Sequence, residues 1–197
     1  MKVTVDNLVV MCMGESFLNY QEFINAVKFI NNQETINFGA RRISVSTAGI
    51  IEGIKRLSGE KIQINLAISL HAASDNLRTK LMPIAKKYPL KDLLAAVDNY
   101  IAKTGRQVMF EYLMISGVND SDRDAENLAI LMKRPLYIVN LIPYNETGRF
   151  TASSREAIRQ FQAVLNKHGV KSTIRHSFGA DILAACGQLH GEKVVSG

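Results

Sequence analysis

Two kinds of residue in this sequence could do chemistry, a cysteine near the C-terminus and polar side chains that follow apolar runs. Cys186 is one of two cysteines in the chain and lies in the small-residue segment 179–189. The neighbouring Gly187 leaves the thiol open to close approach by another group. Spacing alone nevertheless favours a small buried core residue, because most free cysteines are buried. The polar residues that follow apolar runs are Gly14, Glu15, Ser46, Thr47, Ser69, His71, Asn140 and Asn145.

Each of these polar residues has an ordinary structural explanation when it is taken alone. Glu15 suits the first turn of a helix, where it would interact with the helix dipole. Thr47 suits the capping position of a helix, and a histidine placed like His71 is more often structural than catalytic. Ligands of α/β folds, however, bind where the carboxyl ends of the strands converge. Taken together, the clusters favour a pocket for a polar small molecule.

The elements that must position these side chains alternate between strand and helix. Apolar runs predict strands over 8–13, 42–46, 62–70, 107–115, 136–142 and 170–175. Helical spacing and stop signals predict helices over 20–31, from Thr47 to Gly59, around 77–81, over 91–103, over 121–133, and from Ser153 to Gly169. This alternation predicts right-handed βαβ units and a parallel sheet. We therefore expect one α/β domain over residues 1–197, either a partial β/α barrel or an open sheet.

Several local features refine this expectation. The run Leu8–Met13 is continuously apolar, as in a strand buried on both faces. Ser153 and Glu156 have the spacing of a capping box ahead of the last helix. Glu111 alternates with apolar residues in its strand, so it would either point into a barrel or form a structural salt bridge.

Composition limits the classes of function. The net charge is +6 and the isoelectric point is about 9.4, which makes acidic partners plausible. Positive charge gathers in the C-terminal third, as binding to a nucleic-acid backbone requires. No apolar run approaches the length of a membrane span, and the N-terminus lacks the pattern of a signal peptide. Two distant cysteines do not form a secreted disulfide framework, so we expect a reducing, cytoplasmic setting.

Two familiar kinds of site are absent from the sequence. Neither a G-x-G-x-x-G fingerprint nor a P-loop follows the first predicted strand. The histidines are scattered, and two cysteines are too few for the thiolates of an iron–sulfur cluster. We therefore expect no metal ligands in this chain.

A series of sequence blocks resembles the RlmN/Cfr family of radical S-adenosylmethionine enzymes, which methylate an adenine of large-subunit ribosomal RNA. The blocks follow one another in family order and extend from about Leu8 to Leu189. They are 13–15 (MGE), 41–47 (RRISVST), 65–71 (NLAISLH), 81–84 (LMPI), 117–121 (GVNDS), 139–145 (VNLIPYN) and 184–189 (AACGQL).

The resemblance implies a role for particular residues. Gly14 and Glu15 would hold the amino end of S-adenosylmethionine, and the site would be completed by Ser46, Ser69, His71 and Asn145. Cys186 would carry the methyl group that one S-adenosylmethionine donates. In the family, a reduced [4Fe–4S] cluster cleaves a second S-adenosylmethionine, and the resulting radical activates that methyl group for addition to the adenine. Carbon 2 and carbon 8 of the adenine both stay open, as do ribosomal RNA and tRNA as the substrate.

The departure from the family is as specific as the match. The C-x-x-x-C-x-x-C cluster motif and the first strand–helix unit of the radical barrel have no counterpart here, and Cys12 replaces neither. We expect a partial barrel that cannot make the radical alone. Its strand 8–13 would be an exposed apolar edge, which favours a homodimer or pairing with another segment.

Two alternatives stay open. The first is a non-catalytic module that binds S-adenosylmethionine or RNA. The second, weaker alternative is an unrelated β/α-barrel enzyme that uses Glu111 or His71 as a general base.

Overall fold

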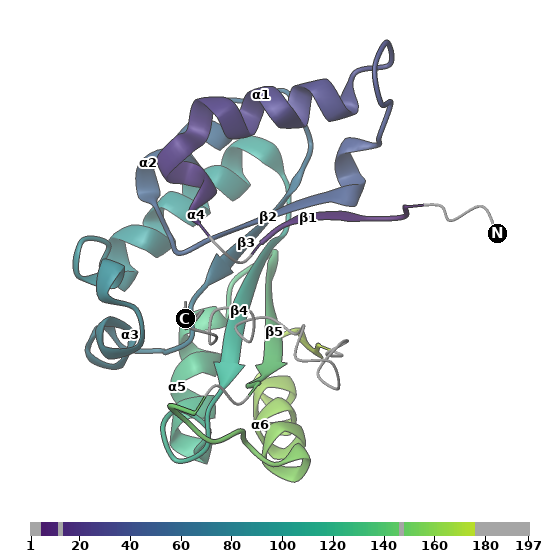
Figure 1. Ribbon diagram of the computed structural model, residues 1–197. Helices are drawn as coiled ribbons and strands as arrows, with labels where there is room; N and C mark the ends of the chain where they lie inside the picture. Colours follow the sequence, from purple (N-terminus) through teal and green to yellow (C-terminus); the bar gives the residue numbers. More distant parts are fainter. Residues whose placement is uncertain (1–4, 12–13, 146–147, 176–197) are drawn as a thin grey trace, which may run out of the picture. The chain divides into compact units, whose positions relative to one another are not determined.

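The computed structural model describes residues 5–11, 14–145 and 148–175 (Figure 1). The strands are β1 (Leu8–Val10), β2 (Ile43–Thr47), β3 (Asn65–Ser69), β4 (Val108–Met114), β5 (Tyr137–Pro143) and β6 (Ser172–Ile174). The α-helices are α1 (Tyr20–Asn31), α2 (Ile51–Leu57), α3 (Asp75–Leu81), α4 (Leu90–Thr104), α5 (Asp122–Met132) and α6 (Arg155–Lys167). Short 3-10 helices are η1 (Ser16–Asn19), η2 (Ala40–Arg42) and η3 (Pro83–Lys86).

The strand order in the sheet is the order in the sequence, from β1 to β6. The chain divides into two compact units. The first comprises Met1–Leu70 with Ser74–Phe110, and the second comprises His71–Ala73 with Glu111–Gly197. The expectation of a single domain over 1–197 stays a prediction.

The first unit is built on the parallel strands β1, β2 and β3. Leu8 of β1 pairs with Ile43 of β2, and Ser44 of β2 pairs with Asn65 of β3. Ile43, Val45 and Thr47 are buried on one face of β2, and α1, α2 and α4 lie on one side of these strands (Figure 1). Parallel strands need such helical cover, since each βα connection returns the chain across the same face.

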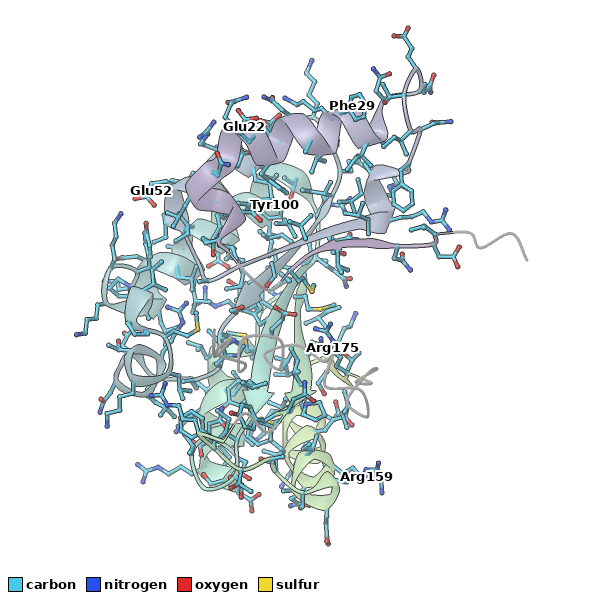
Figure 2. All side chains as sticks on the ribbon, in the orientation of Figure 1. Glu22, Phe29, Glu52, Tyr100, Arg159 and Arg175 are labelled. Carbon is cyan, nitrogen blue, oxygen red and sulfur yellow. The ribbon has the colours of Figure 1, made fainter. Side chains whose placement is uncertain are left out.

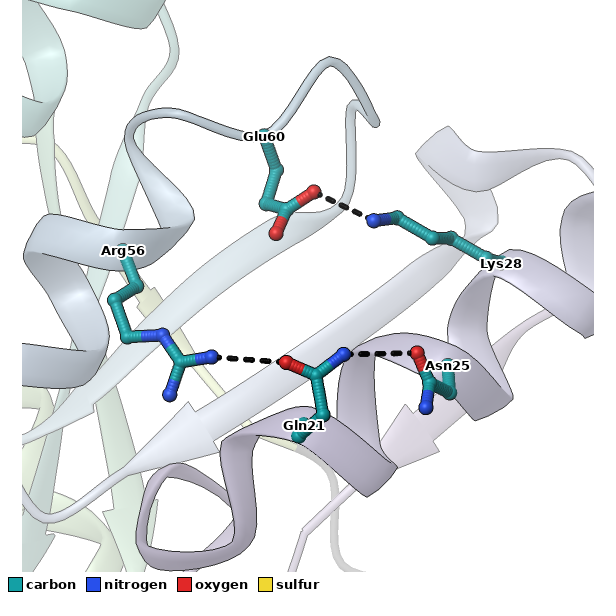
Figure 3. A network of polar contacts seen from close by, with 5 residues as sticks. All are labelled: Gln21, Asn25, Lys28, Arg56 and Glu60. Carbon is teal, nitrogen blue, oxygen red and sulfur yellow. Dashed lines mark hydrogen bonds and ion pairs between the residues drawn. The ribbon is translucent and has the colours of Figure 1, made fainter.

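Helix α1 is fixed to the end of α2 by apolar and polar contacts. Phe17, Tyr20 and Phe23 form a ring cluster, with centroids 5.8 Å apart for the first pair and 6.2 Å for the last two. On the surface, Arg56 donates to Gln21, and Lys28 forms an ion pair with Glu60 (Figure 3). Exposed ion pairs contribute little individually. The Arg56 guanidinium of α2 also lies 3.9 Å from the centre of the Tyr20 ring, which adds a cation–π contact between the two helices.

The second unit packs α5 and α6 against each other and against β5. Val139, Leu141 and Pro143 alternate with Asn140 and Ile142 along β5, and Asn140 pairs with Thr173 of the parallel strand β6. The rings of Tyr112 and Phe161 lie 5.3 Å apart in the core. Ser121 and Asp124 form a complete capping box at the start of α5.

The α/β class and the parallel strands are confirmed, and several local predictions are wrong. β1 is not buried on both faces, since Val9 is 57% exposed at the edge of the sheet. β3 begins at Asn65 rather than at residue 62. The last helix is capped by Ser154, because the Ser153 hydroxyl instead donates to Asp120. Within the described ranges, no helix is long and apolar enough to cross a bilayer.

Candidate functional site

The polar residues of the first unit gather at the carboxyl ends of β2 and β3. Ser46 pairs with Ala67, which lies two residues before Ser69 on the same strand face. Ser46 and Ser69 are half-buried on the face opposite the buried Val45 and Ile68. The face that carries Val45 and Ile68 packs on the helices. The two serines therefore lie on the face that the helices leave open.

Glu15 joins the loop after β1 to the end of β2. One carboxylate oxygen accepts from the Phe17 amide at 3.1 Å, and the other accepts from the Ala48 amide at 2.6 Å. The first contact caps η1, which agrees with the structural explanation for Glu15 from the sequence. The second places an anionic group beside the strand end that carries Ser46. Gly14, with φ of +92°, makes the turn that precedes this carboxylate.

Thr47 organises the turn after β2 rather than capping α2 directly. Its buried hydroxyl accepts from the amides of Gly49 and Ile50 at 3.2 and 3.3 Å. The capping position of α2 is Ile50, which offers no side-chain hydrogen bond. Thr47 therefore pairs two buried amides of the loop, and the prediction of a Thr47 N-cap is wrong in position.

Arg78 is the residue at this edge that the sequence did not single out. Its guanidinium is fully buried and donates to the carbonyls of Ala48, Ser69 and Tyr88. Burial lowers the pKa of Arg78, and the negative charge of Asp75 opposes that shift. A sequence signal for this burial is lacking, because arginine in a short polar helix ordinarily faces solvent.

In the second unit, His71 is held by hydrogen bonds at its backbone and at one ring nitrogen. Its φ is +59°, its amide donates to the Glu111 carbonyl, and its Nδ1 accepts from the Leu113 amide at 3.1 Å. Because Nδ1 accepts a backbone N–H, the ring proton lies on Nε2. Histidine is one of the non-glycine residues that adopt the left-handed region most often, and these contacts fix both its backbone and its tautomer.

Asn119 holds His71 from the other side. Its amide nitrogen donates to the carbonyls of His71 and Leu113 at 2.9 and 2.6 Å, and its side-chain oxygen accepts from the Ile115 amide at 2.8 Å. The Tyr112 hydroxyl donates to the Asn119 carbonyl. The block 117–121, which the sequence associated with the family, thus contributes a completely paired buried amide.

Polar groups also line the strand face of the second unit that its helices leave open. Glu111, 5% exposed, forms an ion pair of 3.7 Å with Arg175 (labelled in Figure 2). Asn140 accepts from the Thr173 hydroxyl, and Asn145 lies half-buried just after β5. The salt-bridge interpretation of Glu111 is confirmed.

The predicted site residues divide between the two units. Gly14, Glu15, Ser46 and Ser69 belong to the first, and His71 and Asn145 belong to the second. Cys186, Cys12 and the segment 179–189 lie outside the described residues. In the ranges that the structure describes, no group of three or more His, Cys, Asp or Glu side chains is placed to hold a metal ion.

Comparison with known proteins gives one consistent result. The chain is 49% identical over 187 residues to a probable dual-specificity RNA methyltransferase RlmN of Alkaliphilus oremlandii, covering 94% of this chain and 54% of that protein. An RlmN protein of Enterococcus faecalis is 45% identical over 195 residues, covering 96% of this chain and 55% of its own length. No protein-family model matches the chain.

Solved structures agree. A radical SAM methyltransferase from Sphaerobacter thermophilus superposes with a TM-score of 0.92 at 48% identity, over 94% of this chain and 55% of the other. A domain of the pyruvate-formate lyase-activating enzyme from Bacteroides vulgatus shares the fold with a TM-score of 0.67 at 19% identity. The chain spans about half the length of the curated relatives it matches. Over nearly all of its own length, the chain is therefore a homologue of the RlmN-type radical SAM methyltransferases, as its sequence blocks predicted.

Proposed function

We propose that this chain forms the S-adenosylmethionine-binding part of an RNA methyltransferase of the RlmN type. The observation that carries the proposal is the hydrogen bond between the Glu15 carboxylate and the Ala48 amide at the end of β2. Ser46 and the neighbouring Ser69 share the open face of the strands at this end. Carboxyl ends of parallel strands are where α/β folds bind small polar ligands. The homologues named as RNA methyltransferases and the radical SAM fold support the same assignment.

The polar groups fit the cofactor chemically. S-adenosylmethionine, when bound, supplies a methyl group on a positively charged sulfonium. The Glu15 carboxylate, with the turn at Gly14, would accept from the ammonium of its amino-acid end, and Ser46 and Ser69 would add hydroxyls. The resemblance also implies His71 and Asn145 as cofactor contacts; both belong to the second unit, and the first unit alone carries the present assignment.

Loss of charge at Glu15 tests this site. We expect Glu15→Gln to weaken binding of S-adenosylmethionine on the order of tenfold, because a charge-assisted contact to the ammonium becomes neutral. Isothermal titration calorimetry with the purified chain measures the change. Glu22→Gln on the exposed face of α1 is the matched control, and it should bind like the original chain. Equal affinities for all three proteins would remove Glu15 from the site.

The residues of this chain do not fit an iron–sulfur cluster. Its two cysteines cannot supply the three thiolates of C-x-x-x-C-x-x-C. We propose that the chain alone does not start radical chemistry. After anaerobic reconstitution with iron and sulfide it should remain colourless, whereas a stable brown [4Fe–4S] species would overturn this part of the proposal.

The substrate in this proposal is an adenine of 23S ribosomal RNA, with tRNA as the other RNA that the resemblance implies, in the cytoplasm. Cys186 would be the methyl carrier. Because the radical-generating part is not among these residues, we expect mass spectrometry of the peptide containing Cys186 to show an unmodified thiol. A methylated Cys186 in the isolated chain would contradict that expectation.

A non-catalytic module is the second candidate, favoured by the polar strand ends without enough cysteines for a cluster. Such a module would act by occupancy of S-adenosylmethionine or RNA. Binding to ribosomal RNA fragments across a salt series distinguishes it, since phosphate contacts make affinity fall steeply with salt. RNA binding that persists without any methyl transfer, even after a cluster-bearing relative is added, would favour the module.

We also propose a homodimer through β1. This strand is the edge of the sheet, and beside it lies an apolar groove of about 260 Å³ lined by residues of β1, η1 and α1. Unpaired strand edges with apolar neighbours associate readily. Val9→Lys should shift the chain toward monomer in sedimentation velocity, whereas the control Ile130→Lys on α5 should not. A monomer at high concentration before any substitution would exclude the dimer.

A further inference from the structure

Arg78 is a buried cation at the carboxyl edge of β2 and β3. It lies on α3, its side chain is fully buried, and its Nε atom has no hydrogen-bond partner among the described residues. Moving a charged group out of water is costly unless its contacts compensate. Packing alone therefore does not explain a buried arginine at this position, since an apolar side chain would fill the space without the cost of burying a charge.

Three backbone carbonyls accept hydrogen bonds from the guanidinium of Arg78. Nη2 donates to Ala48 at 2.7 Å and to Ser69 at 3.3 Å, and Nη1 donates to Tyr88 at 3.0 Å. Ala48 directly follows β2, and Ser69 is the last residue of β3. One planar group thus joins two adjacent strand ends. Lysine could not reproduce this fork, since it carries a single ammonium group.

The Ala48 residue connects Arg78 to Glu15. The Ala48 carbonyl accepts from Arg78, while the Ala48 amide donates to the Glu15 carboxylate at 2.6 Å. Moving the Ala48 backbone would therefore move the acceptor that we assign to the cofactor's ammonium. Arg78 also donates to the Ser69 carbonyl and so fixes the backbone that carries the Ser69 hydroxyl.

Gly49 shows how closely this loop lies against the guanidinium. Its φ is +100°, and a Cβ atom at this position would lie 3.1 Å from Arg78 Nη2 and 3.2 Å from the Leu93 side chain. The close approach and the left-handed backbone both favour glycine here. The loop 47–50 is consequently held from three directions, by Thr47, by Glu15 and by Arg78.

We propose that Arg78 is a positioning residue for S-adenosylmethionine: it fixes the backbone of Ala48 and Ser69, and through Ala48 it fixes the Glu15 carboxylate. The inference rests on the proposed function, because it takes Glu15 and Ser69 as cofactor contacts. Arg78 itself need not touch the cofactor.

The chain offers a matched control at the opposite end of the same strand. Arg106 donates through Nε to the Ile64 carbonyl at 3.1 Å and through Nη2 to Asn65 Oδ1 at 2.8 Å. It therefore also holds β3 by an arginine fork, but at the amino end, away from Glu15 and Ser69. If Arg78 served stability only, replacing either arginine would leave the affinity of the folded chain for S-adenosylmethionine unchanged.

The test compares Arg78→Lys with Arg106→Lys by calorimetry with S-adenosylmethionine, thermal unfolding, and amide hydrogen exchange. We expect Arg78→Lys to weaken binding on the order of tenfold, while Arg106→Lys stays within about twofold. Exchange should accelerate at the Ala48 amide in the first variant and not in the second. Equal losses of affinity in both variants, or unchanged affinity in a folded Arg78→Lys, would overturn the proposal.

The variant Gly49→Ala and the hydrogen exchange of the Ala48 amide provide two further tests. If Arg78→Lys does not fold, Gly49→Ala retains the arginine but crowds its Nη2, so it should weaken binding, and unchanged affinity would overturn the proposal. If the unaltered chain binds no S-adenosylmethionine, the proposed function fails. The positioning role is then judged by exchange at Ala48 alone, where an unchanged rate in Arg78→Lys would overturn it.

Discussion

At the scale of single residues, Asn119 illustrates how a short polar side chain orders a loop. Its amide group is fully buried and uses both hydrogens and the oxygen in bonds to backbone groups. Those bonds join His71, the end of β4 and the turn that precedes α5. Alanine cannot replace them, and it would remove three hydrogen bonds from backbone groups that are buried or half-buried.

We therefore expect Asn119→Ala to lower the free energy of unfolding by about 3 kcal/mol, since each unpaired buried group costs about 1–3 kcal/mol and water relieves part of it. Tyr112→Phe removes only the bond to the Asn119 carbonyl and should cost about 1 kcal/mol. Urea denaturation followed by circular dichroism measures both. Asn25→Ala on the exposed face of α1 is the control, and a similar loss there would contradict the argument.

At the scale of elements, η1 and α2 approach each other more closely than side chains normally permit. A Cβ atom at Gly53 would lie 2.4 Å from the ring of Phe17, which is itself buried against Tyr20 and Phe23. Glycine within a helix is unfavourable by about 1 kcal/mol relative to alanine. Close packing of the aromatic cluster therefore takes precedence over helix propensity here.

Gly53→Ala should destabilise the chain by about 1–3 kcal/mol despite the better helix propensity of alanine, because Phe17 must move from a filled core. Gly39→Ala adds the same methyl group where only the Arg42 side chain is near, at 3.7 Å, and should change little. Thermal unfolding distinguishes the two. A stabilised Gly53→Ala would show that Phe17 repacks freely.

The elements themselves could mostly be predicted from the sequence. Apolar periodicity predicted β2, α1 and α4, because their patterns are long and their stop signals, such as Gly105, are local. The start of β3 and the cap of α6 were misplaced by a few residues. Both depend on tertiary hydrogen bonds, such as the one from Ser153 to Asp120, which no local pattern contains.

The candidate site was predictable in residue types but not in its supports. Glu15, Ser46 and Ser69 follow strands and match family blocks, and the structure brings their strand ends together. Arg78 was not predicted, because its burial results from the packing of α3 against distant carbonyls. Asn119 stood within a recognised block, but its contacts with His71 cross 48 positions of sequence.

At the scale of the whole molecule, buried tyrosines in both units couple folding to alkaline pH. Burial raises the pKa of Tyr20 and Tyr100 in the first unit and of Tyr112 in the second above their ordinary value of 10.0. The charge of Glu60 adds to the pKa shift at Tyr20. Folding therefore favours the neutral phenols.

The stability that these phenols contribute is constant below about pH 10, the pKa of an unfolded tyrosine, and is lost as the pH rises above it. We expect the midpoint of urea unfolding to fall steeply above that pH. Tyr20→Phe and Tyr112→Phe should each make the decline shallower, because each removes one ionisation that unfolding releases. A decline of unchanged slope in both variants would assign the alkaline sensitivity to other groups.

The order of the strands has a consequence for how the protein is made. In the first unit, β2 pairs with β1 and β3 pairs with β2, so each new strand joins one already synthesised. Pairing between strands that are neighbours in the sequence closes smaller loops than pairing between distant strands would, and a lower contact order favours faster folding. A nascent chain can therefore build this sheet while it leaves the ribosome, and the helical cover of α2 is completed only when α4 emerges. Until then, β3 is the growing edge of the nascent sheet, and a ribosome-bound chaperone would protect it best during that interval.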